Sequence, residues 1–162
     1  MASVKLLARS GLLASISIVP VIQSTPDYST GDLIGGKLEL EDAVKFGGGG
    51  GLIQSVMLTN KADAVGVNKD VIFFSSDPAG TTFTENAALN LIEADVVKIV
   101  GVAQINTWVD MTDTSIGFAL DLAMPFVLAS GVTSLFCAMI ERGTMNYDGV
   151  GDLTLKVNIM AA

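Results

Sequence analysis

The residues most suggestive of chemistry are Gly31, Gly36 and Lys37, which lie in the stretch YSTGDLIGGKLELE. Their spacing nearly reproduces a phosphate-binding loop, in which backbone N–H groups and a lysine hold the phosphates of a nucleotide. Such a loop follows a buried strand, has Ser or Thr after its lysine and opens a helix. Here Leu38 takes the hydroxyl position, and the alternating residues after it predict a strand. We therefore expect the glycines to steer a loop into a strand, without nucleotide binding.

Pairs of carboxylates are the next candidates. Asp148 and Asp152 in YDGVGDL could offer oxygen ligands to calcium, as could Asp110 and Asp113. Neither pair has the complete ligand spacing of a calcium loop. Asp is also common in β-turns because its side chain hydrogen-bonds to the turn backbone. The turn interpretation is favoured, and no metal site is expected.

Composition excludes most familiar catalytic mechanisms. The chain has no histidine, which removes the Ser-His-Asp and Cys-His arrangements and the commonest zinc and iron ligand sets. Glu39 and Glu41 could form an acid/base pair, but they alternate with apolar residues as on a solvated strand face. Cys137, the only cysteine, has no neighbouring base and is expected to be a buried small hydrophobe. We predict a protein without enzymatic activity or a cofactor.

Charge and hydropathy restrict the partners. The net charge is −8, and the 9 basic residues are scattered, so no basic stripe is present to neutralise the phosphates of nucleic acid. Half of the residues are apolar and the mean hydropathy is +0.56. Much of that apolar surface must be covered by a core, a partner or a membrane.

One uncharged segment, 122–140, is long enough to be compared with a membrane helix. The turn composition SGVTS and Pro125 argue against a helix, and the flanking residues alternate as strands do. The period of two places Phe118, Leu120, Leu122, Met124, Phe126 and Leu128 on one face. We predict two strands joined near Ser130–Gly131, and no membrane span.

The same alternation recurs along the chain between clusters of Gly, Asp, Asn and Pro. It is clearest where Leu153, Leu155, Val157 and Ile159 share one face, and it also places Leu52, Val56 and Leu58 together. Further runs cover 71–74 and 100–105. A short helix is expected around 93–99. These patterns predict an all-β fold, a β-sandwich or jelly roll of about eight strands with one short helix.

The N-terminal residues form a distinct apolar segment. Ile16, Ile18 and Ile22 alternate with Ser15 and Ser17, and Pro20 would interrupt a helix. We divide the chain into an N-terminal strand or arm, 1–24, and a single β-sandwich domain, 25–162. The apolar arm either packs within its own chain or crosses to an adjacent subunit.

Three large amphipathic aromatics are candidates for contact with a partner. Tyr28, Trp108 and Tyr147 lie in or near expected loops, where such side chains often anchor a binding partner. Each could instead cover an edge of its own core.

Four stretches together carry a family resemblance: TPDYSTGDLIGGKLELE, GGGGGLIQSVMLTNKA, DVIFFSSDPAGTTFTENAALN and ADVVKIVGVAQI. They resemble small virion structural proteins of tailed bacteriophages, some of which are capsid decoration (cement) proteins. The resemblance extends from about Thr25 to the C-terminus. It implies a β-sandwich, often a homotrimer, that binds major capsid protein on the outer surface of the head and bridges capsid subunits.

Two other roles share many of these features. A phage tail or baseplate component would differ chiefly in its location in the particle. A secreted carbohydrate-binding β-sandwich should present a row of exposed aromatic side chains, and the chain has only 1 Trp and 2 Tyr.

Overall fold

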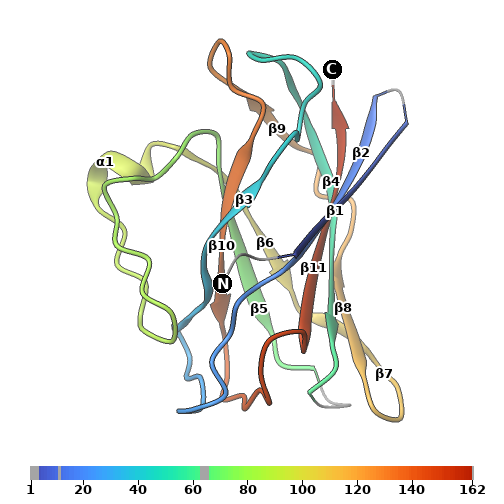
Figure 1. Ribbon diagram of the computed structural model, residues 1–162, viewed down its shortest axis with the longest axis vertical. Coiled ribbons are helices and arrows are strands. Elements are labelled where there is room, and N and C mark those ends of the chain that lie inside the picture. Colours follow the sequence, from blue (N-terminus) through green and yellow to red (C-terminus); the bar gives the residue numbers. More distant parts are fainter. Residues whose placement is uncertain (1–3, 11, 63–65, 162) are drawn as a thin grey trace.

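The computed structural model describes residues 4–10, 12–62 and 66–161, and its regular structure is almost entirely β-strand (Figure 1). Two antiparallel sheets stack on each other, which confirms the all-β class in the form of a β-sandwich. Within the described residues there are eleven strands rather than about eight, because the alternation pattern does not mark the short β7 and runs β8 and β9 together as one strand. The elements are β1 (Val4–Ser10), β2 (Leu13–Val19), β3 (Leu33–Leu40), β4 (Gly50–Asn60), β5 (Lys69–Phe74), α1 (Glu93–Val96), β6 (Ile99–Ile105), β7 (Thr107–Asp110), β8 (Ser115–Ala119), β9 (Met124–Val127), β10 (Leu135–Glu141) and β11 (Leu153–Ala161).

The larger sheet has seven strands in the order β1-β2-β11-β4-β8-β7, with β9 also paired to β4. The smaller sheet has the order β3-β10-β5-β6. The predicted turn at Ser130–Gly131 is present, but it joins β9 in the larger sheet to β10 in the smaller one. Segment 122–140 therefore connects the two layers. No helix in the described part of the chain is long and apolar enough to cross a membrane.

The expected N-terminal strand belongs to the chain's own sheet. β2 lies between β1 and β11, and it pairs with β11 from Ile18 opposite Leu155 to Leu13 opposite Met160. Ile16 and Ile18 are buried in the core, as their alternation predicts. Residues 13–19 are therefore part of the larger sheet of the same chain.

Alternation predicts burial correctly where the strand is regular. Leu153, Leu155, Val157 and Ile159 all face the core from β11. It fails in β4, where Leu52 was expected on the face of Val56 and Leu58. There Gln54 is an extra residue opposite the step from Asn158 to Ile159. This bulge shifts the phase by one residue, so Ile53 enters the core and Leu52 does not.

The predicted common face from Phe118 to Leu128 is also wrong. Phe126 and Leu128 are buried, whereas Leu120 is exposed. Asp121 and Ala123 have φ values of 55° and 46°. These left-handed conformations change the direction of the chain between β8 and β9. The side chains from Phe118 to Leu128 therefore do not share one face.

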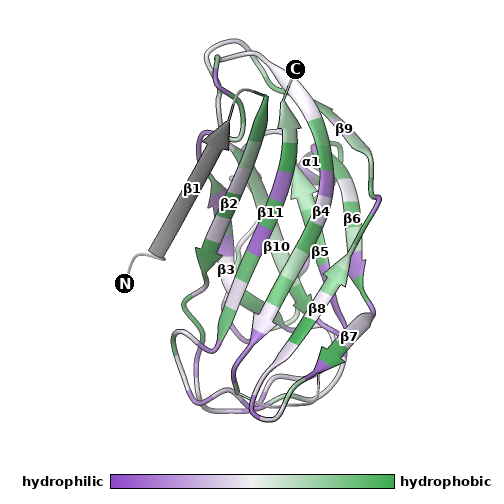
Figure 2. Ribbon diagram, turned by 90° about the vertical axis from the view of Figure 1, so that its right-hand side faces the viewer, coloured by the Kyte–Doolittle hydropathy of each residue, from purple (hydrophilic) through white to green (hydrophobic). Residues whose placement is uncertain are grey.

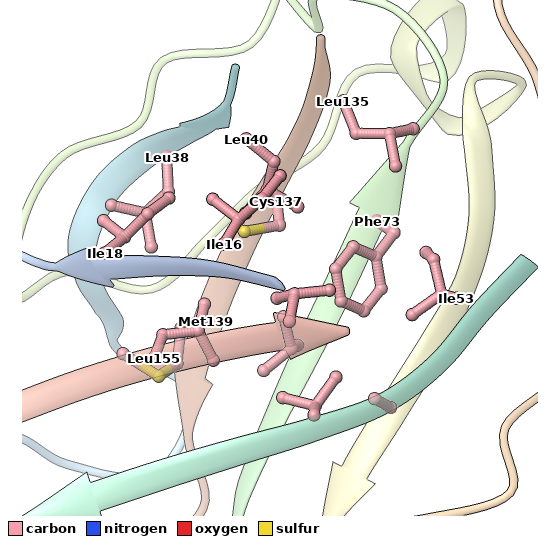
Figure 3. Packing of buried hydrophobic residues seen from close by; sticks show 14 of the residues in the cluster. Ile16, Ile18, Leu38, Leu40, Ile53, Phe73, Leu135, Cys137, Met139 and Leu155 are labelled. Carbon is pink, nitrogen blue, oxygen red and sulfur yellow. The ribbon is translucent and has the colours of Figure 1, made fainter. Parts of the chain in front are cut away.

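The main core fills the space between the sheets (Figure 3). Both sheets contribute large aliphatic groups to this core from their inward-facing sides. Full burial of each such side chain contributes roughly 1.5–3 kcal/mol. The labelled members from the larger sheet are Ile16, Ile18, Ile53 and Leu155, and those from the smaller sheet are Leu38, Leu40, Phe73, Leu135, Cys137 and Met139.

Residues 75–98, which we call the strap, connect β5 to β6 and cover the outer face of the smaller sheet (Figure 1). The strap contains α1, the short helix predicted within 93–99. Phe83, Leu89 and Leu91 of the strap pack against a second buried cluster on that face. Both faces of the smaller sheet are thus covered. In the part of the chain that the structure describes, no helix or loop lies over the outer face of the larger sheet between β2 and β8 (Figure 2).

Candidate functional site

The glycines of the opening motif lie inside a strand rather than before one. Lys37 pairs with Ala138 and Ile34 with Met139, so Gly35 and Gly36 form a two-residue bulge in β3. Their φ values of 77° and 69° suit glycine and strain other residues. We expected these glycines in a loop before the strand, and the structure places them within the strand instead. Lys37 is followed by more strand, not by the helix that a phosphate-binding loop opens.

The residues of this motif contact carboxylates from another part of the same chain. Lys37 Nζ lies 2.5 Å from Asp77 Oδ1, and the Tyr28 hydroxyl donates a hydrogen bond to Glu85 Oε1. Burial raises the pKa of Glu85, and the Tyr28 hydroxyl together with the nearby backbone N–H groups of Gly35 and Gly36 opposes the rise. Asp77 and Glu85 both belong to the strap. The groups that resemble an anion-binding loop therefore fasten the strap to β3.

A second polar group lies fully inside the sandwich. Lys69 Nζ is 3.3 Å from Glu141 Oε1 and donates a 2.8 Å hydrogen bond to the Val67 carbonyl, and neither charged side chain is exposed. The Tyr147 hydroxyl donates to Glu141 Oε2 at 2.8 Å. Burial lowers the pKa of Lys69, and the Glu141 charge opposes this. The Trp108 ring also faces the ammonium group, with its centroid 5.3 Å from Nζ.

The structure places the three aromatic candidates in the core or at its edge. Tyr28 and Tyr147 are 0% exposed and meet edge to face, with ring centroids 5.2 Å apart. They offer no surface to a partner, so their assignment as contact residues is wrong for this fold. Trp108 is partly buried, and a Cβ at Gly66 would lie 1.9 Å from its ring. It covers the edge of its own core, which was the alternative considered for all three.

The remaining candidates from the sequence are the carboxylate pairs and Cys137. Asp152 Oδ2 accepts the backbone N–H groups of Asp148 and Gly149 at 2.7 and 3.0 Å, as the turn interpretation predicts. In the described residues, no group of three or more potential ligand side chains could hold a metal ion. Burial raises the pKa of Cys137 to about 12, consistent with the predicted buried hydrophobe. Glu39 is exposed on β3.

An exposed apolar surface that was not predicted lies at one end of the larger sheet. Leu13 pairs with Met160, Met160 with Leu52, and Leu52 with Pro125, which makes an apolar row across β2, β11, β4 and β9. Leu12, Leu52, Phe126, Val127 and Met160 line a groove of about 550 Å³ beside this row. We call the row and the groove the apolar end surface.

This surface is exposed and uncharged. Leu12, Leu13, Val127 and Met160 are among the exposed large hydrophobics of the chain. The chain has 17 acidic residues, yet β2, β4, β8, β9 and β11 contain none. Next to the apolar row, Asn158 hydrogen-bonds to both Ser15 and Ser55, so the neighbouring outer row is polar but neutral. The acidic charge of the protein lies elsewhere.

One signal in the sequence points to this surface. Successive strand residues face opposite sides, so adjacent large apolar residues cannot all be buried in one core. The pairs Leu12–Leu13, Leu52–Ile53 and Phe126–Val127 show this pattern. The three pairs meet at one end only through the strand order, which one sequence does not reveal.

The sequence matches no model of a protein family and no curated protein.

Proposed function

We propose that the chain is a non-enzymatic structural protein of a tailed-phage virion. In this proposal it decorates the outer surface of the head as a homo-oligomer, a trimer by family resemblance, and bridges subunits of the major capsid protein. The observation that carries the proposal is the apolar end surface, which lies on strands that contain no acidic residue. Large exposed apolar patches on soluble proteins commonly mark contacts with other proteins.

The charged side chains of the sequence candidates pair with groups of the same chain, which agrees with a structural role. Lys37 pairs with Asp77, Lys69 with Glu141, and the Asp152 carboxylate with its own turn. Each of these contacts ties together segments that are distant in the sequence or closes a turn. A protein in a capsid shell must stay folded while neighbouring subunits exert force on it. Contacts of this kind raise the free energy of local unfolding.

The experiment is a reconstitution. Virions are prepared from the phage genome that encodes the chain and from a mutant that lacks this gene, and purified protein is added back to the mutant heads. We expect the chain in wild-type virions by mass spectrometry, and regular extra density on the outer head surface by electron microscopy after add-back. Add-back of the Val127→Asp variant, altered at the apolar end surface, serves as the matched comparison and should bind more weakly.

Other outcomes would replace the proposal. Density on the tail or baseplate would assign the chain to that structure. Absence from purified virions, together with binding on a glycan array, would favour a carbohydrate-binding protein.

A further inference from the structure

Lys69 and Glu141 are placed so that their side chains could react with each other. The two residues are direct partners at the ends of β5 and β10, and neither side chain has exposed surface. Lys69 Nζ lies 3.3 Å from Glu141 Oε1, which is longer than a typical charge-assisted hydrogen bond of about 2.7–2.9 Å. The nitrogen is therefore next to the carboxyl group without being held to it by a short hydrogen bond.

We propose that Lys69 and Glu141 condense after folding into an isopeptide bond between Lys69 Nζ and Glu141 Cδ. A proton passes from the ammonium group to Oε1, which gives a neutral amine and a neutral carboxyl group. The amine lone pair then forms the N–C bond while the bond from Cδ to Oε1 breaks. Oε1 takes a second proton from the nitrogen and leaves as water. One ammonium and one carboxylate thus become one amide and one water, and the step needs no further reactant.

The surroundings of the pair favour condensation. The ring centroids of Trp108 and Tyr147 lie 5.3 and 5.9 Å from Lys69 Nζ. Burial lowers the pKa of Lys69, which favours the neutral amine that reacts, although the Glu141 charge opposes this change. Condensation also replaces two buried charges by one neutral amide, whose burial costs less free energy.

Two hydrogen bonds orient the reacting groups. Lys69 Nζ donates to the Val67 carbonyl at 2.8 Å, and the Tyr147 hydroxyl donates to Glu141 Oε2 at 2.8 Å. The hydroxyl stabilises the negative charge that develops on Oε2 during the attack, as donors in an oxyanion hole do. Fixed proximity of this kind raises the effective concentration of an intramolecular reactant by several orders of magnitude.

The bond joins strands that are far apart in the sequence. Lys69 and Glu141 are separated by 72 residues, so the amide closes a long loop between β5 and β10. A covalent link across such a loop restricts the unfolded chain, as a disulfide does. The chain has a single cysteine and can form no internal disulfide. This modification goes beyond the proposed function and does not depend on it.

The mass of the intact, denatured chain after incubation near neutral pH tests the bond. We expect the wild type to be lighter than its sequence by one water. Lys69→Arg should have its full mass, because a guanidinium group stays protonated and does not attack. Lys37→Arg is the matched control and should lose one water as the wild type does, because it leaves the buried pair unchanged. A wild-type chain that keeps its full mass after prolonged incubation would overturn the inference.

Digestion with trypsin locates the bond, since loss of water at another site gives the same mass. We expect no cleavage after Lys69 in the wild type, and one branched peptide that contains both Lys69 and Glu141. Cleavage after Lys69 in the lighter species, or a loss of water that persists in Lys69→Arg, would refute the assignment. The wild-type digest decides even if Lys69→Arg does not fold, and neither result depends on whether the chain is found on virions.

Discussion

The ammonium nitrogen of Lys69 lies 3.3 Å from a carboxylate oxygen of Glu141, and both side chains are completely buried. The two residues are direct partners across β5 and β10, and the Tyr147 hydroxyl binds the other oxygen of Glu141. The pair thus joins the smaller sheet to the connection between β10 and β11. A buried network of this kind is costly to break because each member has lost its contact with water.

We predict that Lys69→Met destabilises the protein by about 3–5 kcal/mol, because it leaves the Glu141 carboxylate buried without its cation. The free energy of unfolding in urea measures the effect. Lys37→Met is the control, since its pair with Asp77 is partly exposed and should contribute at most about 1 kcal/mol. Lys69→Met combined with Glu141→Gln should recover part of the loss. Equal, small effects of Lys69→Met and Lys37→Met would contradict the importance of the buried pair.

Alkaline pH should reveal the two buried tyrosines. Burial raises the pKa values of Tyr28 and Tyr147 above the ordinary 10.0. Above pH 10 the unfolded chain loses these protons while the folded chain keeps them. This contribution to stability is therefore present below pH 10 and is lost as the pH rises further. Ultraviolet titration should show no phenolate until the protein unfolds, and then both tyrosines should ionise together. The urea-unfolded chain is the reference, and stepwise ionisation near pH 10 in the folded protein would refute the burial.

The phase of β11 can be checked with two neighbouring residues. Leu155→Ala should cost roughly 2–5 kcal/mol because Leu155 is fully buried between the sheets. Thr154 faces outward, and Thr154→Ala should change the free energy of unfolding by no more than about 0.5 kcal/mol. Chemical denaturation of both variants makes the comparison. Reversed magnitudes would mean that the strand is turned the other way.

Two glycines with positive φ values separate backbone strain from crowding. A Cβ at Gly31 (φ 101°) would have nothing within 4 Å, so Gly31→Ala should cost only the strain of its conformation, about 1–2 kcal/mol. At Gly35 (φ 77°) the Cβ would lie 2.3 Å from that of Pro20, and overpacking should add about 1–3 kcal/mol. Thermal or urea unfolding measures both variants. Equal losses would show that the segment around Pro20 moves aside freely.

Nucleotide titration tests the motif from which the sequence analysis starts. We expect no heat on calorimetric titration with ATP and magnesium, because Lys37 is paired with Asp77 and the Gly35 and Gly36 amides lie near the carboxylate of Glu85. Micromolar binding that disappears in Lys37→Ala would mean that a nucleotide displaces the strap.

Features that depend on local geometry could be predicted from residue spacing. A regular strand turns successive side chains to opposite sides, so Leu155 and Val157 could be assigned to the core from their spacing alone. The all-β class, the short helix near Glu93 and the buried state of Cys137 follow from similarly local patterns.

Which segments meet could not be predicted in this way, because it depends on the packing of the whole chain. The bulge at Gln54 reverses the side on which Leu52 and Ile53 lie, and a bulge is defined by the partner strand as much as by its own residues. Lys69 and Glu141 are 72 residues apart, and their pairing exists because β5 and β10 are neighbours in the smaller sheet. Strand order in a sandwich results from packing of the whole chain. The burial of Tyr28 and Tyr147 and the gathering of exposed apolar residues at one end therefore could not be predicted from residue spacing alone.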